Sequence, residues 1–218
     1  MKMKKGKVNF KDLKLNLKKF TFSMLGIFLT CLGVAFNNNT GLGNDPVGMI
    51  YDGLRVAFNI PILKLGYVSN FLNIGLMLIL LLIGRRYLNI GTLMYLLPYG
   101  LFVTFGSNLY VSIFPKQTWL TSSLGGLLGV SFYYIGISLF VAADIGVDPF
   151  NGLMLTLRDI SGWSLRKSKV IFDAFLILLG LLLGGKLGLI TAITAVTTGP
   201  VLQFLSGWFK QKLMMGVT

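Results

Sequence analysis

The apolar residues of this chain gather in long runs that are separated by short polar or glycine-rich stretches. Six of these runs approach the roughly 20 residues that an α-helix needs to cross the hydrocarbon core of a bilayer. They cover about 20–38, 63–84, 88–106, 120–142, 168–185 and 188–209. Two further segments, 46–58 and 149–160, have only about a dozen residues each and contain charged side chains. The pattern predicts an all-α polytopic membrane protein with about six transmembrane helices and two short helices that do not cross.

One motif occurs twice. Gly-Leu-Gly-Asn-Asp-Pro ends at Pro46, and Asp-Ile-Gly-Val-Asp-Pro ends at Pro149, 103 residues later. Identities continue at this spacing on both sides, without a gap, at Leu25/Leu128, Gly26/Gly129, Gly33/Gly136, Leu54/Leu157, Arg55/Arg158, Ile74/Ile177 and Leu78/Leu181. A fixed spacing of this kind is typical of duplicated structural units. We therefore predict repeat 1 over 20–106 and repeat 2 over 120–209, joined by a connecting loop at 107–119.

Each copy of the motif interrupts the chain just before a short helix. Asp45 and Asp148 occupy the position where a carboxylate accepts hydrogen bonds from free backbone N–H groups. Pro46 and Pro149 follow in the first helical turn, where proline is tolerated. Each repeat therefore contains a short half-helix after a Gly/Asp-Pro break.

Charge is scarce and unevenly placed. Only 12% of the residues are charged, which is about half the share in soluble domains, and the chain has no His. The net charge of +13 includes eight lysines within 1–19. A basic cluster beside an apolar run holds a terminus in the cytoplasm and attracts anionic lipid headgroups. We interpret 1–19 as a basic cytoplasmic tail and 210–218 as a short cytoplasmic tail, and we exclude a nucleic-acid partner.

The distribution of basic residues permits two topologies. With six spans, only Arg55, Lys64, Lys116 and Lys186 of the twenty Lys and Arg residues lie outside, and sixteen lie inside. Three spans per repeat is an odd number, so the two halves are inverted. If both short helices cross, there are eight spans and parallel halves, with seventeen basic residues inside and three outside. Both arrangements obey the positive-inside rule; the length and polarity of the short helices favour six spans.

Inverted halves place the two half-helix N-termini near each other at mid-membrane. Each such end carries about half a positive charge, which suits an anion or a carboxylate-bearing solute. Asp45 and Asp148 allow two interpretations: the carboxylates cap their own helices, or they line a path and bind a cation or a proton.

Further polar residues lie in the predicted spans. Asp173 follows Lys169 by one turn, which indicates either an ion pair near the interface or an ionisable group facing a cavity; its counterpart in the first repeat is Asn70. The threonines of the last span share one face and serve either helix packing or a pore lining. The predicted substrate or ion pathway consists of Asp45, Pro46, Asn70, Asp148, Pro149, Asp173, Thr194 and Thr198.

Catalytic chemistry has few candidate residues here. The chain lacks His and Glu, and the single cysteine, Cys31, has no companion for a disulfide or a metal site. The Gly-x-Gly-Asp motif of membrane aspartyl proteases is interrupted by Asn44 in the first copy, and the second copy lacks the leading glycine. We predict no enzyme activity, no metal and no cofactor.

Several motifs together suggest a family. The duplicated Gly/Asp-Pro break, the Gly-Trp-Ser-Leu-Arg loop at 162–166 and Thr-Gly-Pro at 198–200 resemble the YczE/YyaS/YitT group of bacterial integral membrane proteins, and the YczE branch in particular. The resemblance covers about 20–205. It implies a multi-pass protein of the bacterial inner (cytoplasmic) membrane, and it identifies no substrate residues.

Two functions fit this sequence. One is a transporter or permease for a small solute or ion, with its site between the two repeats. The alternative is a membrane-embedded regulatory or partner subunit without transport activity of its own, whose basic tail docks a partner or lipid. Partners are the bilayer and a small solute or ion, and both a homo-oligomer and a membrane-protein partner remain open.

Overall fold

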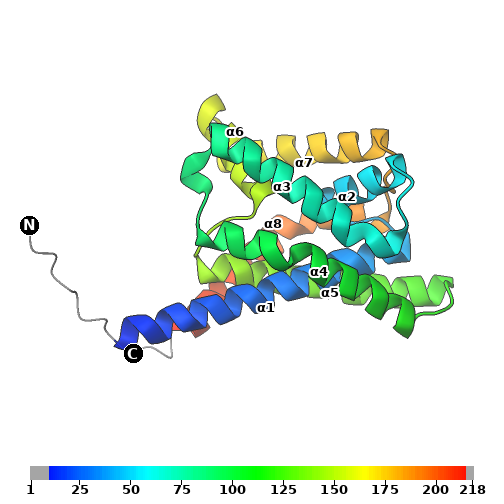
Figure 1. The fold of residues 1–218 in the computed structure, drawn as a ribbon, viewed down its shortest axis with the longest axis horizontal. Helices are drawn as coiled ribbons and strands as arrows, with labels where there is room; N and C mark the ends of the chain where they lie inside the picture. The colour runs from blue at the N-terminus through cyan, green and yellow to red at the C-terminus, as the bar shows by residue number, and fades with distance from the viewer. Residues whose placement is uncertain (1–9, 215–218) are drawn as a thin grey trace, which may run out of the picture.

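The computed structural model describes residues 10–214, and all regular structure in this range is helical (Figure 1). The α-helices are α1 (Phe10–Thr40), α2 (Pro46–Ala57), α3 (Leu65–Ile83), α4 (Ile90–Ile113), α5 (Trp119–Ala143), α6 (Pro149–Ser161), α7 (Leu165–Leu182) and α8 (Leu189–Met214). Two 3₁₀ turns, Ile62–Lys64 and Arg85–Tyr87, flank α3. The expectation of an all-α membrane protein is confirmed.

Within the described residues, five helical stretches are long and apolar enough to cross a membrane. They lie in α1, in Ile62–Ile83, and in α4, α5 and α8. The predicted span at 168–185 belongs to α7, which is not among them. That helix has only 18 residues, and Arg166, Lys167, Lys169 and Asp173 lie in its first half.

The two predicted tails are partly helical. Helix α1 begins at Phe10, so it extends into the segment 1–19, and α8 continues to Met214. Residues 1–9 and 215–218 lie outside the described part of the chain, and with them four of the eight N-terminal lysines. Helix α1 begins and α8 ends at the same end of the bundle (Figure 1).

Helices α1 and α5 pack closely along their lengths in opposite directions. A Cβ atom added to Gly26 would lie 2.7 Å from the carbonyl oxygen of Gly136, and one added to Gly33 would lie 2.7 Å from that of Gly129. The earlier of the two α1 glycines thus meets the later α5 glycine, and the later α1 glycine meets the earlier one. Small residues permit such close approach of helix backbones in membranes.

Each break is held by the first turn of a long helix from the other half. The N–H of Ile190 in α8 donates to the carbonyl oxygen of Leu42 at 3.0 Å, and the N–H of Gly91 in α4 donates to that of Ile145 at 3.2 Å. Irregular backbone within a membrane must find its hydrogen bonds inside the protein. These contacts meet that requirement, and they also satisfy N–H groups that a helix start leaves free.

Asn44 stabilises the first break with a buried amide. Its Oδ1 accepts from the N–H of Asp45 at 2.8 Å, and its Nδ2 donates to the carbonyl oxygen of Val34 at 3.0 Å.

We expect Asn44→Val, which copies the residue at the matching position Val147, to lower the free energy of unfolding by about 1–3 kcal/mol. The loss would be measured by thermal unfolding in detergent, with Val147→Ala as the matched control at the second break. Equal stability of Asn44→Val and wild type would contradict this role.

Candidate functional site

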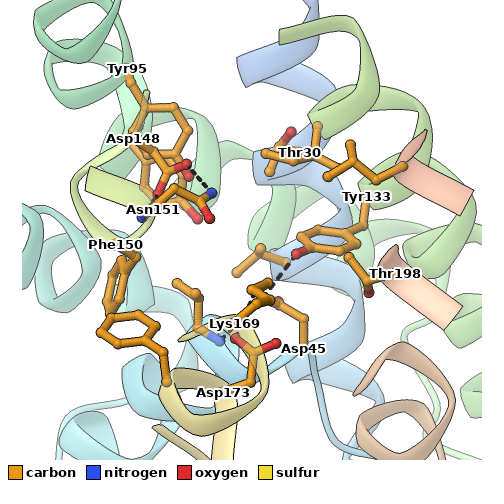
Figure 2. A pocket seen from close by; sticks show the side chains of 16 residues that line it. Thr30, Asp45, Tyr95, Tyr133, Asp148, Phe150, Asn151, Lys169, Asp173 and Thr198 are labelled. Atoms are coloured by element: carbon orange, nitrogen blue, oxygen red, sulfur yellow. Dashed lines mark hydrogen bonds and ion pairs between the residues drawn. The ribbon is translucent and has the colours of Figure 1, made fainter. Parts of the chain in front are cut away.

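A cavity lies between the two halves of the chain, with a volume of about 50 Å³. This is room for a few water molecules. Sixteen residues line it, and they come from α1, α2, the two breaks and α4 to α8 (Figure 2). Helix α3 contributes none of them.

The lining residues come in matched positions. Twelve of the sixteen form six pairs at the spacing of 103 residues. These pairs are Thr30/Tyr133, Val34/Ile137, Asp45/Asp148, Val47/Phe150, Tyr95/Thr198 and Tyr99/Leu202. The other four, Asn151, Lys169, Phe172 and Asp173, all belong to α6 and α7. The cavity is thus shared between the halves, and the second half supplies the additional polar groups.

Asp45 and Asp148 lie on opposite sides of the cavity, each at the start of a short helix (Figure 2). Both are nearly fully buried. The carboxylate of Asp45 accepts from the N–H groups of Val47 at 3.1 Å and Gly48 at 3.3 Å, and that of Asp148 accepts from the N–H of Asn151 at 3.0 Å. The capping interpretation is therefore confirmed, and the same carboxylates line the cavity.

Each of these carboxylates also accepts from a side chain. The hydroxyl of Tyr133 donates to Asp45 Oδ2 at 3.2 Å, and the amide of Asn151 donates to Asp148 Oδ2 at 2.6 Å (Figure 2). Such bonds fix the orientation of a buried carboxylate and stabilise it. A carboxylate therefore lies directly in front of the N-terminus of each short helix.

Lys169 and Asp173 form the predicted ion pair on α7, with 2.6 Å between Lys169 Nζ and Asp173 Oδ1. Both residues also line the cavity, so the two interpretations of Asp173 apply together. The cavity contains three carboxylates and one ammonium group. Within residues 10–214, no three His, Cys, Asp or Glu side chains are arranged to hold a metal ion.

Some of the predicted pathway residues lie elsewhere. Thr198 lines the cavity, whereas Thr194 is buried and donates to the carbonyl oxygen of Ile190 at 2.8 Å. Asn70 lies at the contact of α3 with α4, where its Oδ1 accepts from the N–H of Gly100 at 3.0 Å. The prolines Pro46 and Pro149 are buried first residues of their helices and are not among the lining residues.

Sequence reasoning missed Thr30, Tyr133 and Asn151 as site residues. Thr30 and Tyr133 are matched positions with different chemistry, so a comparison that scores identities passes over them. A usable signal was present: Val34 lies one turn after Thr30, and Ile137 lies one turn after Tyr133, so each pair shares a helix face.

Comparison with known proteins places the chain in a family. Residues 17–207 match the family of unknown function DUF6198. The chain belongs to this family. The expected resemblance to the YczE-like group is confirmed, because relatives named YczE and YyaS match this chain over most of their length.

Three relatives illustrate the similarity. An uncharacterized protein of Haemophilus influenzae is 27% identical over 186 residues, which cover 84% of this chain and 82% of that protein. The uncharacterized membrane protein YczE of Bacillus subtilis is 24% identical over 85% of this chain and 84% of its own length. The uncharacterized protein YyaS of Bacillus subtilis is 22% identical over 85% of this chain and 90% of its own length. No solved structure matches the chain.

Proposed function

We propose that this DUF6198 protein is a transporter or permease for a small solute or ion, with its site in the cavity between the two halves. The observation that carries the proposal is the lining itself, in which twelve of sixteen residues occur as matched pairs 103 residues apart. A site at the junction of two related halves, next to broken helices, is typical of secondary transporters.

The proposal includes two inverted repeats of three membrane-spanning helices, each with a half-helix. The antiparallel packing of α1 on α5 supports this arrangement, since these helices carry the matching glycines. The crossed contacts of α8 with the first break and of α4 with the second break support it as well. We further propose the bacterial inner membrane and cytoplasmic termini, in agreement with the basic N-terminal segment.

The charges of the cavity favour a cation or a proton over an anion. The carboxylates of Asp45 and Asp148 accept hydrogen bonds from backbone N–H groups in the first turns of α2 and α6, so these donors are not free for an anionic ligand. The lining contains three carboxylates and one ammonium group, so acidic side chains are in excess at this site. Opposite charge nearby stabilises a bound cation most strongly where the surroundings are poorly polar.

Proteoliposomes test this function directly. Purified protein would be exposed to concentration jumps of sodium, potassium, ammonium and protons, and the charge movement would be recorded. We expect a current for at least one cation, and we expect Asp148→Asn to reduce it by about tenfold or more because an intramembrane carboxylate is removed. Asp144→Asn is the matched control: Asp144 is an exposed carboxylate four residues earlier, and it pairs with Lys210 at the surface.

The outcomes separate the two candidate functions. If Asp148→Asn and Asp144→Asn reduced the cation current equally, the cavity would have no role in the transport. A folded protein that carries none of these cations would favour the alternative, a membrane-embedded regulatory or partner subunit. That alternative predicts a stoichiometric co-purifying protein.

A further inference from the structure

The two halves differ in how their last two helices meet. Helix α3 packs along α4 in the first half. The corresponding helices α7 and α8 barely touch each other over their described lengths. Helix α8 packs mainly on α5, as α4 does on α1, and the apolar stretch of α8 is mostly not covered by the rest of the chain. Helices α3 and α4 therefore form a closed pair, whereas their counterparts α7 and α8 form a parted pair.

The closed pair is fastened by small and neutral polar residues. Asn70 of α3 accepts from the N–H of Gly100 in α4 at 3.0 Å. A Cβ atom added to Gly100 would lie 2.7 Å from Asn70 Cγ, so these helices are in close contact at this point. Gly66, one turn before Asn70, faces the backbone of Gly100 as well.

The parted pair carries charges at the same positions. Lys169 and Asp173 of α7 match Gly66 and Asn70 at the spacing of 103. They bind each other along α7, and their side chains are 38% and 17% exposed. Closing α7 onto α8 would bury this pair, and removing two charges from water opposes burial by several kcal/mol per ion.

Exposure of the matched lining residues shows the same difference. Tyr95 and Tyr99 of α4 are 4% and 1% exposed. Their counterparts Thr198 and Leu202 of α8 are half-buried. The lining residues of α4 are therefore covered by the rest of the chain, whereas those of α8 are partly exposed.

We infer that the cavity opens between α7 and α8, and that the Lys169–Asp173 pair keeps this entrance parted. The entrance lies towards the end of the bundle where α1 begins and α8 ends, because Lys169 is close to the start of α7 and α8 runs towards that end (Figure 1). The opposite state closes α7 on α8 and separates α3 from α4. This inference rests on the proposed function for its purpose, since a transporter must expose its site on alternate sides.

Thiol modification tests the entrance without any transport measurement. Single cysteines would replace Thr198, as the reporter, or the fully buried Thr194 on the same helix, as the protected control, in a Cys31→Ala background. Purified protein in nanodiscs would react with a small water-soluble methanethiosulfonate reagent. We expect rapid modification at position 198 and slow modification at position 194. An unreactive cysteine at position 198 would overturn the entrance.

Exchange variants test the ion pair. Lys169→Gly with Asp173→Asn copies the residues of the closed half into the open one. We expect it to slow modification of the cysteine at position 198 by about tenfold, because closing α7 on α8 then buries no charges. Lys167→Gln, on the exposed face of α7, should leave the rate unchanged. If the double variant does not yield monodisperse protein, Lys169→Met with Asp173→Asn, which removes both charges and keeps the size of the side chains, should slow the reaction in the same direction. An unchanged rate in the folded variant would refute the role of the pair. If the wild-type protein carried no cation current while the cysteine at position 198 reacted as expected, only the proposed transport would be refuted.

Discussion

The variant Gly33→Leu is expected to lose the folded state. Gly33 lies where α1 meets α5, and a Cβ atom there would be 2.7 Å from both the Tyr133 Cα and the Gly129 carbonyl oxygen. Both are backbone atoms, so no side chain can rotate away to make room. Overpacking a well-packed interior destabilises by about 1–3 kcal/mol and sometimes more. A leucine side chain here must separate the two helices, so we expect little monodisperse protein and a strongly lowered melting temperature in detergent.

Gly75→Leu is the matched control for this prediction. Gly75 lies in α3, and a Cβ atom there would have no neighbour within 4 Å. Since an added side chain there has open space, the same substitution should leave the yield and the melting temperature nearly unchanged. If Gly33→Leu had the same melting temperature as the wild type, the close antiparallel contact of α1 with α5 would not be essential for this fold.

Cysteines placed at the α2–α3 and α6–α7 connections are expected to react with a labelling reagent from opposite sides of the membrane. Asn59 follows α2, and Arg166 lies in the first turn of α7. Both are exposed, and the α2–α3 and α6–α7 connections lie at opposite ends of the bundle (Figure 1). In a Cys31→Ala background, a membrane-impermeant maleimide should label Asn59→Cys in intact cells and Arg166→Cys only after permeabilisation. The difference should be close to all or none, because a charged reagent does not cross the bilayer.

The labelling pattern decides between the topologies that the basic residues leave open. Labelling of both cysteines on one side would mean that the short helices cross and that the halves are parallel. The two half-helix N-termini would then not approach each other from opposite sides, and the proposed transport site would lose its geometric basis. A cysteine at Phe58, which is 71% exposed beside Asn59, provides an independent check of the first loop.

Local features of the fold were predictable because they depend on neighbours in the sequence. The N-caps of α2 and α6 follow from Asp-Pro pairs, and the apolar runs follow from the cost of placing polar groups in lipid. The ion pair of Lys169 with Asp173 follows from a four-residue spacing on a helix. None of these needs knowledge of how the helices pack.

The lining of the cavity was predicted only in part. Of the residues predicted as a pathway, Asp45, Asp148, Asp173 and Thr198 line the cavity, whereas Asn70 and Thr194 serve helix contacts and backbone bonding. A polar residue in a membrane helix can face a cavity or a neighbouring helix, and the sequence is similar in the two cases. The rotation of each helix about its axis makes the difference.

The sequence by itself determined the membrane class, the order of long and short helices and the two capped breaks, because lipid solvation and capping act over a few residues. Only the tertiary structure decided that matched positions converge on one cavity, that Lys169 and Asp173 border it while Gly66 and Asn70 close against α4, and that α7 and α8 are parted. These properties arise from contacts between helices far apart in the chain. Such contacts depend on shape at the scale of a single Cβ atom, which composition and spacing do not specify.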